Sequence, residues 1–101
     1  MIKINVSQQD TSIDSISIKG HADYAEKGKD IVCASVSSIV ITSVNAIIRL
    51  DSESISYQES DGLIKINVLK QNEVVNILLT NMIDLLENLE QQYKKNIKIN
   101  K

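Results

Sequence analysis

The sequence predicts an α+β fold in which two helices pack on one mixed β-sheet. Several short segments alternate apolar and polar side chains, which is typical of half-buried strands. Two longer segments repeat apolar residues at helical spacing, and the order along the chain is ββαββα with a possible final strand. The chain has 101 residues, of which 43% are hydrophobic and 24% charged. We therefore expect a single globular domain spanning residues 1–101.

The first two strands are predicted at residues 1–7 and 13–19. Both segments alternate, and their apolar residues lie on one face: Ile2, Ile4, Val6, Ile13, Ile16 and Ile18. Residues 8–12 between them are polar and turn-like, so the two strands form a hairpin. Residues 20–29 break the pattern between Gly20 and Gly28, and we predict a mobile loop there.

Residues 30–50 are predicted to form a buried helix. Their Ile and Val content favours a strand on propensity, but the length and the spacing favour a helix. The residues on which this spacing rests recur at three, four and seven positions: Ile31, Ala34, Ile41, Val44 and Ile48. Asp30 is a suitable N-cap because its carboxylate can accept the free amides of the first turn.

The second half of the chain repeats the same order of elements. Strands are predicted at residues 53–57 and 63–69, on either side of the turn Ser60-Asp61-Gly62. An amphipathic helix follows, capped by Asn72, with these apolar positions: Val75, Leu78, Leu79, Met82, Leu85, Leu86, Leu89 and Tyr93. Residues 96–100 are predicted to form a short final strand.

The charge and the cysteine count exclude several classes of protein. A net charge of −2 argues against a dedicated nucleic-acid surface, and we expect the lysines of the tail to be solvated: Lys94, Lys95, Lys98 and Lys101. One cysteine excludes an internal disulfide. No unbroken apolar run reaches the eighteen or so residues that a membrane helix needs, and residues 1–6 do not resemble a secretory signal. We therefore expect a cytoplasmic protein with a reduced thiol and no membrane partner.

Residues 20–37 contain the only histidine, His21, and the only cysteine, Cys33. Cys33 follows the proposed N-cap by three residues, and the amides and dipole of a helix N-terminus favour the nucleophilic thiolate. First-turn amides can also donate to an oxyanion, and a nearby histidine can accept and return the thiol proton. Asp30 or Asp23 could orient the imidazole, and the sequence does not decide between them.

Ordinary structural explanations exist for each of these residues. A single cysteine in an apolar helix is usually a small buried hydrophobe, and a single histidine at a strand end is usually a surface residue. Asp30 can serve only as an N-cap, and Ser37 only as a helix-packing residue. One histidine and one cysteine do not complete a zinc site, and no nucleotide-binding glycine motif is present. From the residues alone, an enzyme and a binding module are about equally supported.

The segment also resembles a family signature. The motif Gly20-His21-Ala22, Tyr24-Ala25, Gly28, Asp30-Ile31-Val32-Cys33-Ala34 and Val36-Ser37 is similar to that of the ribosomal-processing cysteine protease family Prp. The length and the order of elements agree over the whole domain. One departure is Ser35, where many members of the family carry alanine. Serine is similarly small, so the resemblance is little affected.

The resemblance implies a specific activity. Members of the family remove a short N-terminal extension from the large-subunit ribosomal protein L-twenty-seven, cutting after a hydrophobic, aromatic-containing motif. They are homodimers with an α/β sandwich and need no cofactor. The remaining alternative is a non-catalytic module that binds a ribosomal protein or peptide during ribosome assembly.

The same resemblance implies roles for individual residues. Cys33 would be the nucleophile and His21 the general base, whereas Asp30 would orient or anchor and Ser37 would contact substrate. Gly20 belongs to the motif as an orienting or substrate-contacting position. Residues 22–29 suit a lid that closes over a peptide, with Tyr24 as the candidate closing contact.

Overall fold

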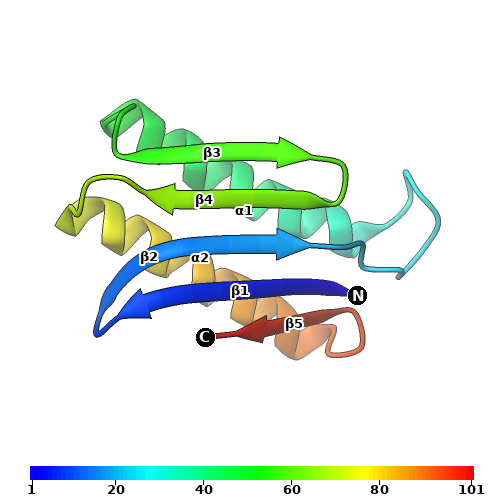
Figure 1. Ribbon diagram of the computed structural model, residues 1–101. Coiled ribbons are helices and arrows are strands. Elements are labelled where there is room, and N and C mark those ends of the chain that lie inside the picture. Colours follow the sequence, from blue (N-terminus) through cyan, green and yellow to red (C-terminus); the bar gives the residue numbers. More distant parts are fainter.

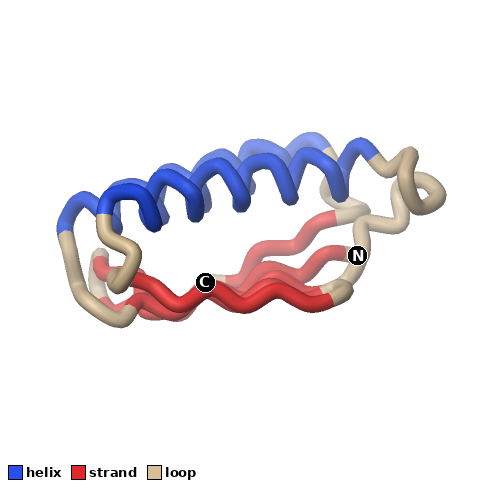
Figure 2. Tube along the Cα trace, turned by 90° about the horizontal axis from the view of Figure 1, so that it is seen from above, coloured by secondary structure: helices blue, strands red, loops and turns tan.

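Seven elements make up the chain, and all 101 residues are described in the computed structural model. They run, in order, β1 (Ile2–Gln9), β2 (Ser12–Lys19), α1 (Ile31–Leu50), β3 (Ile55–Ser60), β4 (Leu63–Val68), α2 (Glu73–Gln92) and β5 (Ile97–Asn100). Both helices cover the same face of the sheet, which gives two layers (Figures 1 and 2). The predicted α+β fold with its final strand is confirmed.

The five strands form one mixed sheet in the order β3-β4-β2-β1-β5. The pairs β1–β2, β2–β4 and β3–β4 are antiparallel, whereas β1 and β5 are parallel. The β1–β5 pairing places the last residues of the chain beside the first strand. As a result the turn that precedes β5 lies at the same end of the sheet as the start of β1 (Figure 1).

The buried face of α1 differs from the predicted one. The buried residues are Val32, Val36, Val40, Val44 and Ile47. Of the residues that define the predicted repeat, only Val44 is buried, and the remaining four are exposed: Ile31, Ala34, Ile41 and Ile48. Apolar residues occur around most of this helix, so their spacing alone does not identify which side meets the sheet.

α1 is the one helix that is long and apolar enough to cross a membrane by length and composition. This is weak evidence for a membrane segment, because the core helix of a water-soluble protein passes the same test. Here the valine face of α1 packs into the same core as the inward-facing residues of the sheet.

The second half of the chain follows the predicted order of elements, but two details differ. β3 starts later than predicted, and in α2 Leu85 is exposed whereas Ile83 is buried. α2 begins after its N-cap Asn72, whose side chain accepts from the amides of Val74 and Val75. The buried residues of α2 are Val75, Leu79, Met82, Ile83 and Leu86. β3 starts two residues later than predicted, because residues 52–54 form a turn. In that turn the Ser54 hydroxyl donates to the carbonyl oxygen of Asp51.

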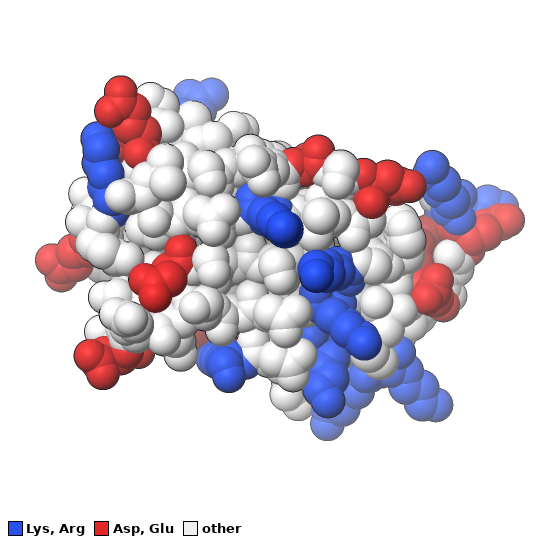
Figure 3. Space-filling model, in the orientation of Figure 1, with Lys and Arg blue, Asp and Glu red and all other residues white.

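The face of the sheet opposite the helices carries a group of lysines (Figure 3). Lys3 is the register partner of Lys19 on β2 and of Lys98 on β5, and all three side chains are exposed. The sheet thus adds two lysines from the N-terminal hairpin to the basic cluster expected for the tail. None of the three has a carboxylate within ion-pair distance.

Candidate active site

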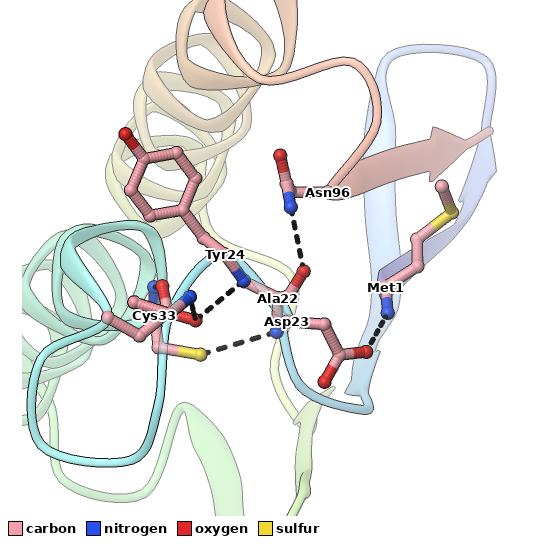
Figure 4. Close-up of polar contacts among 8 residues, drawn as sticks. Met1, Ala22, Asp23, Tyr24, Cys33 and Asn96 are labelled. Carbon is pink, nitrogen blue, oxygen red and sulfur yellow. Dashed lines mark hydrogen bonds and ion pairs between the residues drawn. The ribbon is translucent and has the colours of Figure 1, made fainter.

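Cys33 lies in the first turn of α1 and is half-buried. Its sulfur accepts a hydrogen bond from the backbone N–H of Ala22, at 3.3 Å (Figure 4). A donor aimed at the sulfur can stabilise negative charge that develops on it. The donor comes from the segment after β2, eleven residues before Cys33 in the sequence.

Asp30 connects the loop to the start of α1. Its Oδ1 accepts from the amides of Val32 and Cys33, each at 3.0 Å. Its Oδ2 accepts from the amides of Tyr24 and Ala25, at 3.0 and 3.3 Å. Desolvation raises the pKa of this carboxyl, but the hydrogen bonds from Cys33, Ala25, Tyr24 and Val32 outweigh it and hold the pKa below its usual value. The geometry supports the anchoring role for Asp30.

The predicted use of first-turn amides as oxyanion donors is wrong for three of them. The amides of Val32 and Cys33 donate to the Asp30 carboxylate. The amide of Ala34 donates to the Asp30 carbonyl oxygen at 3.1 Å. The N-cap thus fixes the start of the helix but occupies the donors that an oxyanion would need.

His21 follows β2 and lies against the turn between β3 and β4. Its Nε2 is 3.9 Å from Oδ1 of Asp61, and both side chains are exposed. A Cβ at Gly62 would lie only 3.2 Å from His21 Nε2, so the absence of a side chain at that position leaves room for the imidazole. The sequence did not single out Asp61, because forty residues separate it from His21 and no local spacing connects them.

Neither Asp30 nor Asp23 hydrogen-bonds to His21. Asp23 forms an ion pair with the amino group of Met1 at 2.9 Å (Figure 4). No hydrogen bond joins His21 to Cys33 in this structure. Catalytic hydrogen bonds often form only when substrate binds, so the lack of this hydrogen bond is compatible with a Cys-His pair.

Gly20 sets the position of His21. Its φ is +94°, and a Cβ at this residue would lie 2.5 Å from the carbonyl oxygen of Met1. Its N–H donates to the carbonyl oxygen of Gly62 at 2.9 Å, which ties the end of β2 to the β3–β4 turn. Only glycine fits this close approach of two backbone segments.

Two cavities meet at the candidate catalytic residues. The larger, of about 500 Å³, is lined by His21, Asp23, Ala25, Lys27, Gly28, Asp30, Cys33, Ala34, Ser37 and Asp61. The smaller, of about 160 Å³, has aliphatic walls formed by Ile2, Ile18, Val36, Leu63 and Ile64. Both are lined by His21, Cys33 and Ser37, so these three residues lie where the two cavities meet.

The loop after β2 is held more firmly in its first half than the sequence indicated. Ala22 is buried, and the ring of Tyr24 packs edge-on against Tyr93, with centroids 5.5 Å apart. Tyr24 therefore faces the end of α2 and is not among the residues that line the cavities. The second half is held by a contact of Lys29 with Glu26, through their backbones and their side chains. Residues 26–29 are the part of the loop with the fewest constraints.

The residues of this site offer no metal centre, since no three His, Cys, Asp or Glu side chains are grouped so as to hold an ion.

Known proteins are similar in sequence to this chain over most of its length. The family model described as "Cysteine protease Prp" matches residues 1–98. The ribosomal processing cysteine protease Prp of Staphylococcus aureus is 36% identical over 104 residues, covering 99% of this chain and 98% of that protein. The protein of the same name from Bacillus subtilis is 32% identical, covering 89% of this chain and 87% of the relative.

Solved structures agree with these sequence matches. The S. aureus protease in complex with a covalently linked product peptide superposes with a TM-score of 0.93 at 35% identity, covering 99% and 98% of the two chains. The same protease in complex with a substrate peptide gives a TM-score of 0.87 at 34% identity, with the same coverage. From the matched sequence, the shared fold and the site around its single cysteine, this chain belongs to the Prp family of cysteine proteases.

Proposed function

We propose that this chain is a ribosomal processing endopeptidase that removes the N-terminal extension of a large-subunit ribosomal protein of the L-twenty-seven family. Cys33 is the nucleophile and His21 the general base. One observation carries the assignment: the sulfur of Cys33 lies at the junction of the two cavities, in a first helical turn, with an amide N–H directed at it. A cysteine that served only as a buried hydrophobe would not need a donor on its sulfur.

The residues present support a thioester mechanism. The Cys33 thiolate attacks the carbonyl carbon of the scissile bond, which forms a C–S bond and moves an electron pair onto the carbonyl oxygen. The C–N bond then breaks, and the proton held by His21 passes to the leaving amine. Water gives a proton to His21 and attacks the thioester, which releases the acid fragment and regenerates the thiolate.

The cavities support a preference for a peptide with apolar side chains. Five aliphatic side chains line the smaller cavity, beside Glu59 and Ser60, and favour an apolar residue there. The larger cavity is bordered by the loop residues Asp23, Lys27 and Gly28. Ser37 lines both cavities one helical turn after Cys33, where its hydroxyl can contact the peptide backbone. Residues 26–29 close the larger cavity over the bound peptide, as a lid narrower than residues 22–29.

The test is cleavage of the precursor ribosomal protein by the wild type, Cys33→Ala and His21→Ala. We expect the wild type to release one short N-terminal peptide and both variants to lose at least about a thousand-fold in kcat/KM. Ser56→Ala, on β3, is the matched control and should cleave at the wild-type rate. Cleavage by Cys33→Ala at the wild-type rate would overturn the assignment.

The outer surface of the helix layer supports a homodimer. Large apolar side chains are exposed on α1 and α2: Ile31, Ile41, Ile48, Leu50, Val74, Ile77 and Leu85. Exposed apolar side chains on both helices can be covered by a partner, and a second copy is the simplest one. Sedimentation should show twice the 11.2 kDa chain mass for the wild type and a monomer for Ile41→Asp. A cytoplasmic location fits the single unpaired thiol.

A further inference from the structure

We infer that Asn96 is a positioning residue of the active site, which holds Ala22 so that the Ala22 N–H donates to the sulfur of Cys33. The inference rests on the proposal that Cys33 is the nucleophile. Asn96 lies in the turn between α2 and β5, more than sixty residues after Cys33 in the sequence, and no motif in the sequence points to it.

Ala22 is fixed from three directions. Its carbonyl oxygen accepts a hydrogen bond from Nδ2 of Asn96 at 2.9 Å. Its N–H donates to the sulfur of Cys33 at 3.3 Å, and its side chain is buried with 1% of its surface exposed. Figure 4 shows Asn96 and Cys33 on opposite sides of this residue. A shift at the carbonyl is therefore transmitted to the N–H that faces the sulfur.

Asn96 is itself held on both sides. Its backbone N–H donates to the carbonyl oxygen of Tyr93 at 2.9 Å, which anchors it to the end of α2. Its backbone carbonyl oxygen accepts a hydrogen bond from the N–H of Ile2 at 2.8 Å, which anchors Asn96 to the start of β1. Because a carbonyl oxygen can only accept, the amide nitrogen of Asn96 is the atom that must face Ala22. The side chain is a rigid donor supported by two elements.

The backbone next to Ala22 requires such support. Asp23 is not glycine yet has a φ of +57°, a conformation that costs free energy and persists only where neighbouring contacts enforce it. Asn96 secures the residue before Asp23, and the contact between Tyr93 and Tyr24 secures the residue after it. The turn at residues 93–96 therefore holds the loop on both sides of its strained position.

Loss of the Asn96 side chain should lower the reactivity of Cys33 without abolishing it. The Ala22 carbonyl would lose its partner, the strained turn would relax, and the N–H would leave the sulfur for part of the time. We expect Asn96→Ala and Asn96→Asp to lower the rate at which Cys33 is alkylated at neutral pH by about five-fold. Asn96→Asp keeps the shape of the side chain but has no donor and repels the carbonyl oxygen.

The experiment measures the rate at which iodoacetamide alkylates Cys33 as a function of pH. Both Asn96 variants should move the midpoint of the rate profile upward by about 0.7 pH units, the equivalent of five-fold. Asn100→Ala is the matched control, because Asn100 also donates one side-chain hydrogen bond, to Oδ1 of Asn5 on the sheet. Its profile should coincide with that of the wild type. A lower melting temperature with an unchanged midpoint would show that Asn96 is merely structural and overturn the inference.

A second measurement in the wild-type chain applies even if the Asn96 variants fold poorly. The amide proton signal of Ala22 in an NMR titration should shift with the ionisation of Cys33, and this shift should be absent in Cys33→Ala. An Ala22 signal that does not follow the thiol would contradict the inference. Neither measurement uses substrate. A negative result would therefore contradict the role of Asn96 alone, whereas failure of the proposed function would appear as cleavage by Cys33→Ala.

Discussion

At the scale of single residues, Asp30 and Gly20 fix the backbone around the candidate site. Asp30 accepts four backbone amides, two from the loop and two from the first turn of α1. Gly20 allows two backbone segments to approach where a side chain would collide. Both residues therefore constrain the backbone that carries His21 and Cys33.

Substitution of Asp30 should produce a pH-dependent loss of stability. Its folded pKa lies below the ordinary 3.8, so the carboxylate stabilises the fold above that pH, and the contribution is lost as the pH falls through the folded value. The melting temperature of Asp30→Asn should be lower than that of the wild type at pH 6, and the difference should narrow below about pH 3.8. Asp84→Asn, at an exposed carboxylate of α2, is the control. A difference that widens in acid would contradict the role given to Asp30.

The two glycines that border the loop should differ in their tolerance of a side chain. Both have positive φ, but a Cβ at Gly28 meets nothing within 4 Å, whereas one at Gly20 meets the Met1 carbonyl oxygen at 2.5 Å. Gly28→Ala should cost about 1 kcal/mol of unfolding free energy from backbone strain alone. Gly20→Ala should cost about 3 kcal/mol or more, because β1 and β2 must also separate. Urea denaturation measures both, and equal costs would rule out the proposed clash.

At the scale of elements, the first helix shows what the sequence could not supply. Its existence and its N-cap follow from local patterns, and both are confirmed. The side of α1 that is buried does not follow from local patterns, because the helix is apolar around most of its circumference. Packing against the sheet determines that the valine face is buried. α2 has a clear polar side, so its buried residues follow largely from the spacing.

Adjacent isoleucines near the end of α1 provide a test of this orientation. Ile47 is fully buried, whereas 39% of the Ile48 surface is exposed. Ile47→Ala should lower the unfolding free energy by about 2–5 kcal/mol through loss of buried area and formation of a cavity. Ile48→Ala should change it by less than about 1 kcal/mol. Comparable losses in urea denaturation would mean that α1 is rotated from the orientation described.

At the scale of the whole molecule, the sequence predicted the order of elements and pointed to His21 and Cys33 as candidates. It did not predict which distant segments pack beside these two residues. Local alternation and capping define each strand and helix, and the motif around Cys33 is contiguous. The partners supplied by other segments are not contiguous: Asp61 beside His21 comes from the β3–β4 turn, and Asn96 from the turn before β5. These contacts depend on the strand order, which no local pattern encodes.

The central claim is that Cys33 forms a covalent bond with the substrate, and the single cysteine of the chain makes this directly measurable. Precursor peptide is mixed with enzyme, quenched in acid within milliseconds, and the intact protein mass is recorded. We predict a transient mass increase equal to the acyl fragment of the peptide, removed by hydroxylamine as expected for a thioester and absent in Cys33→Ala. Turnover by the wild type with no thiol adduct at any time point, or an adduct that persists in Cys33→Ala, would contradict the account.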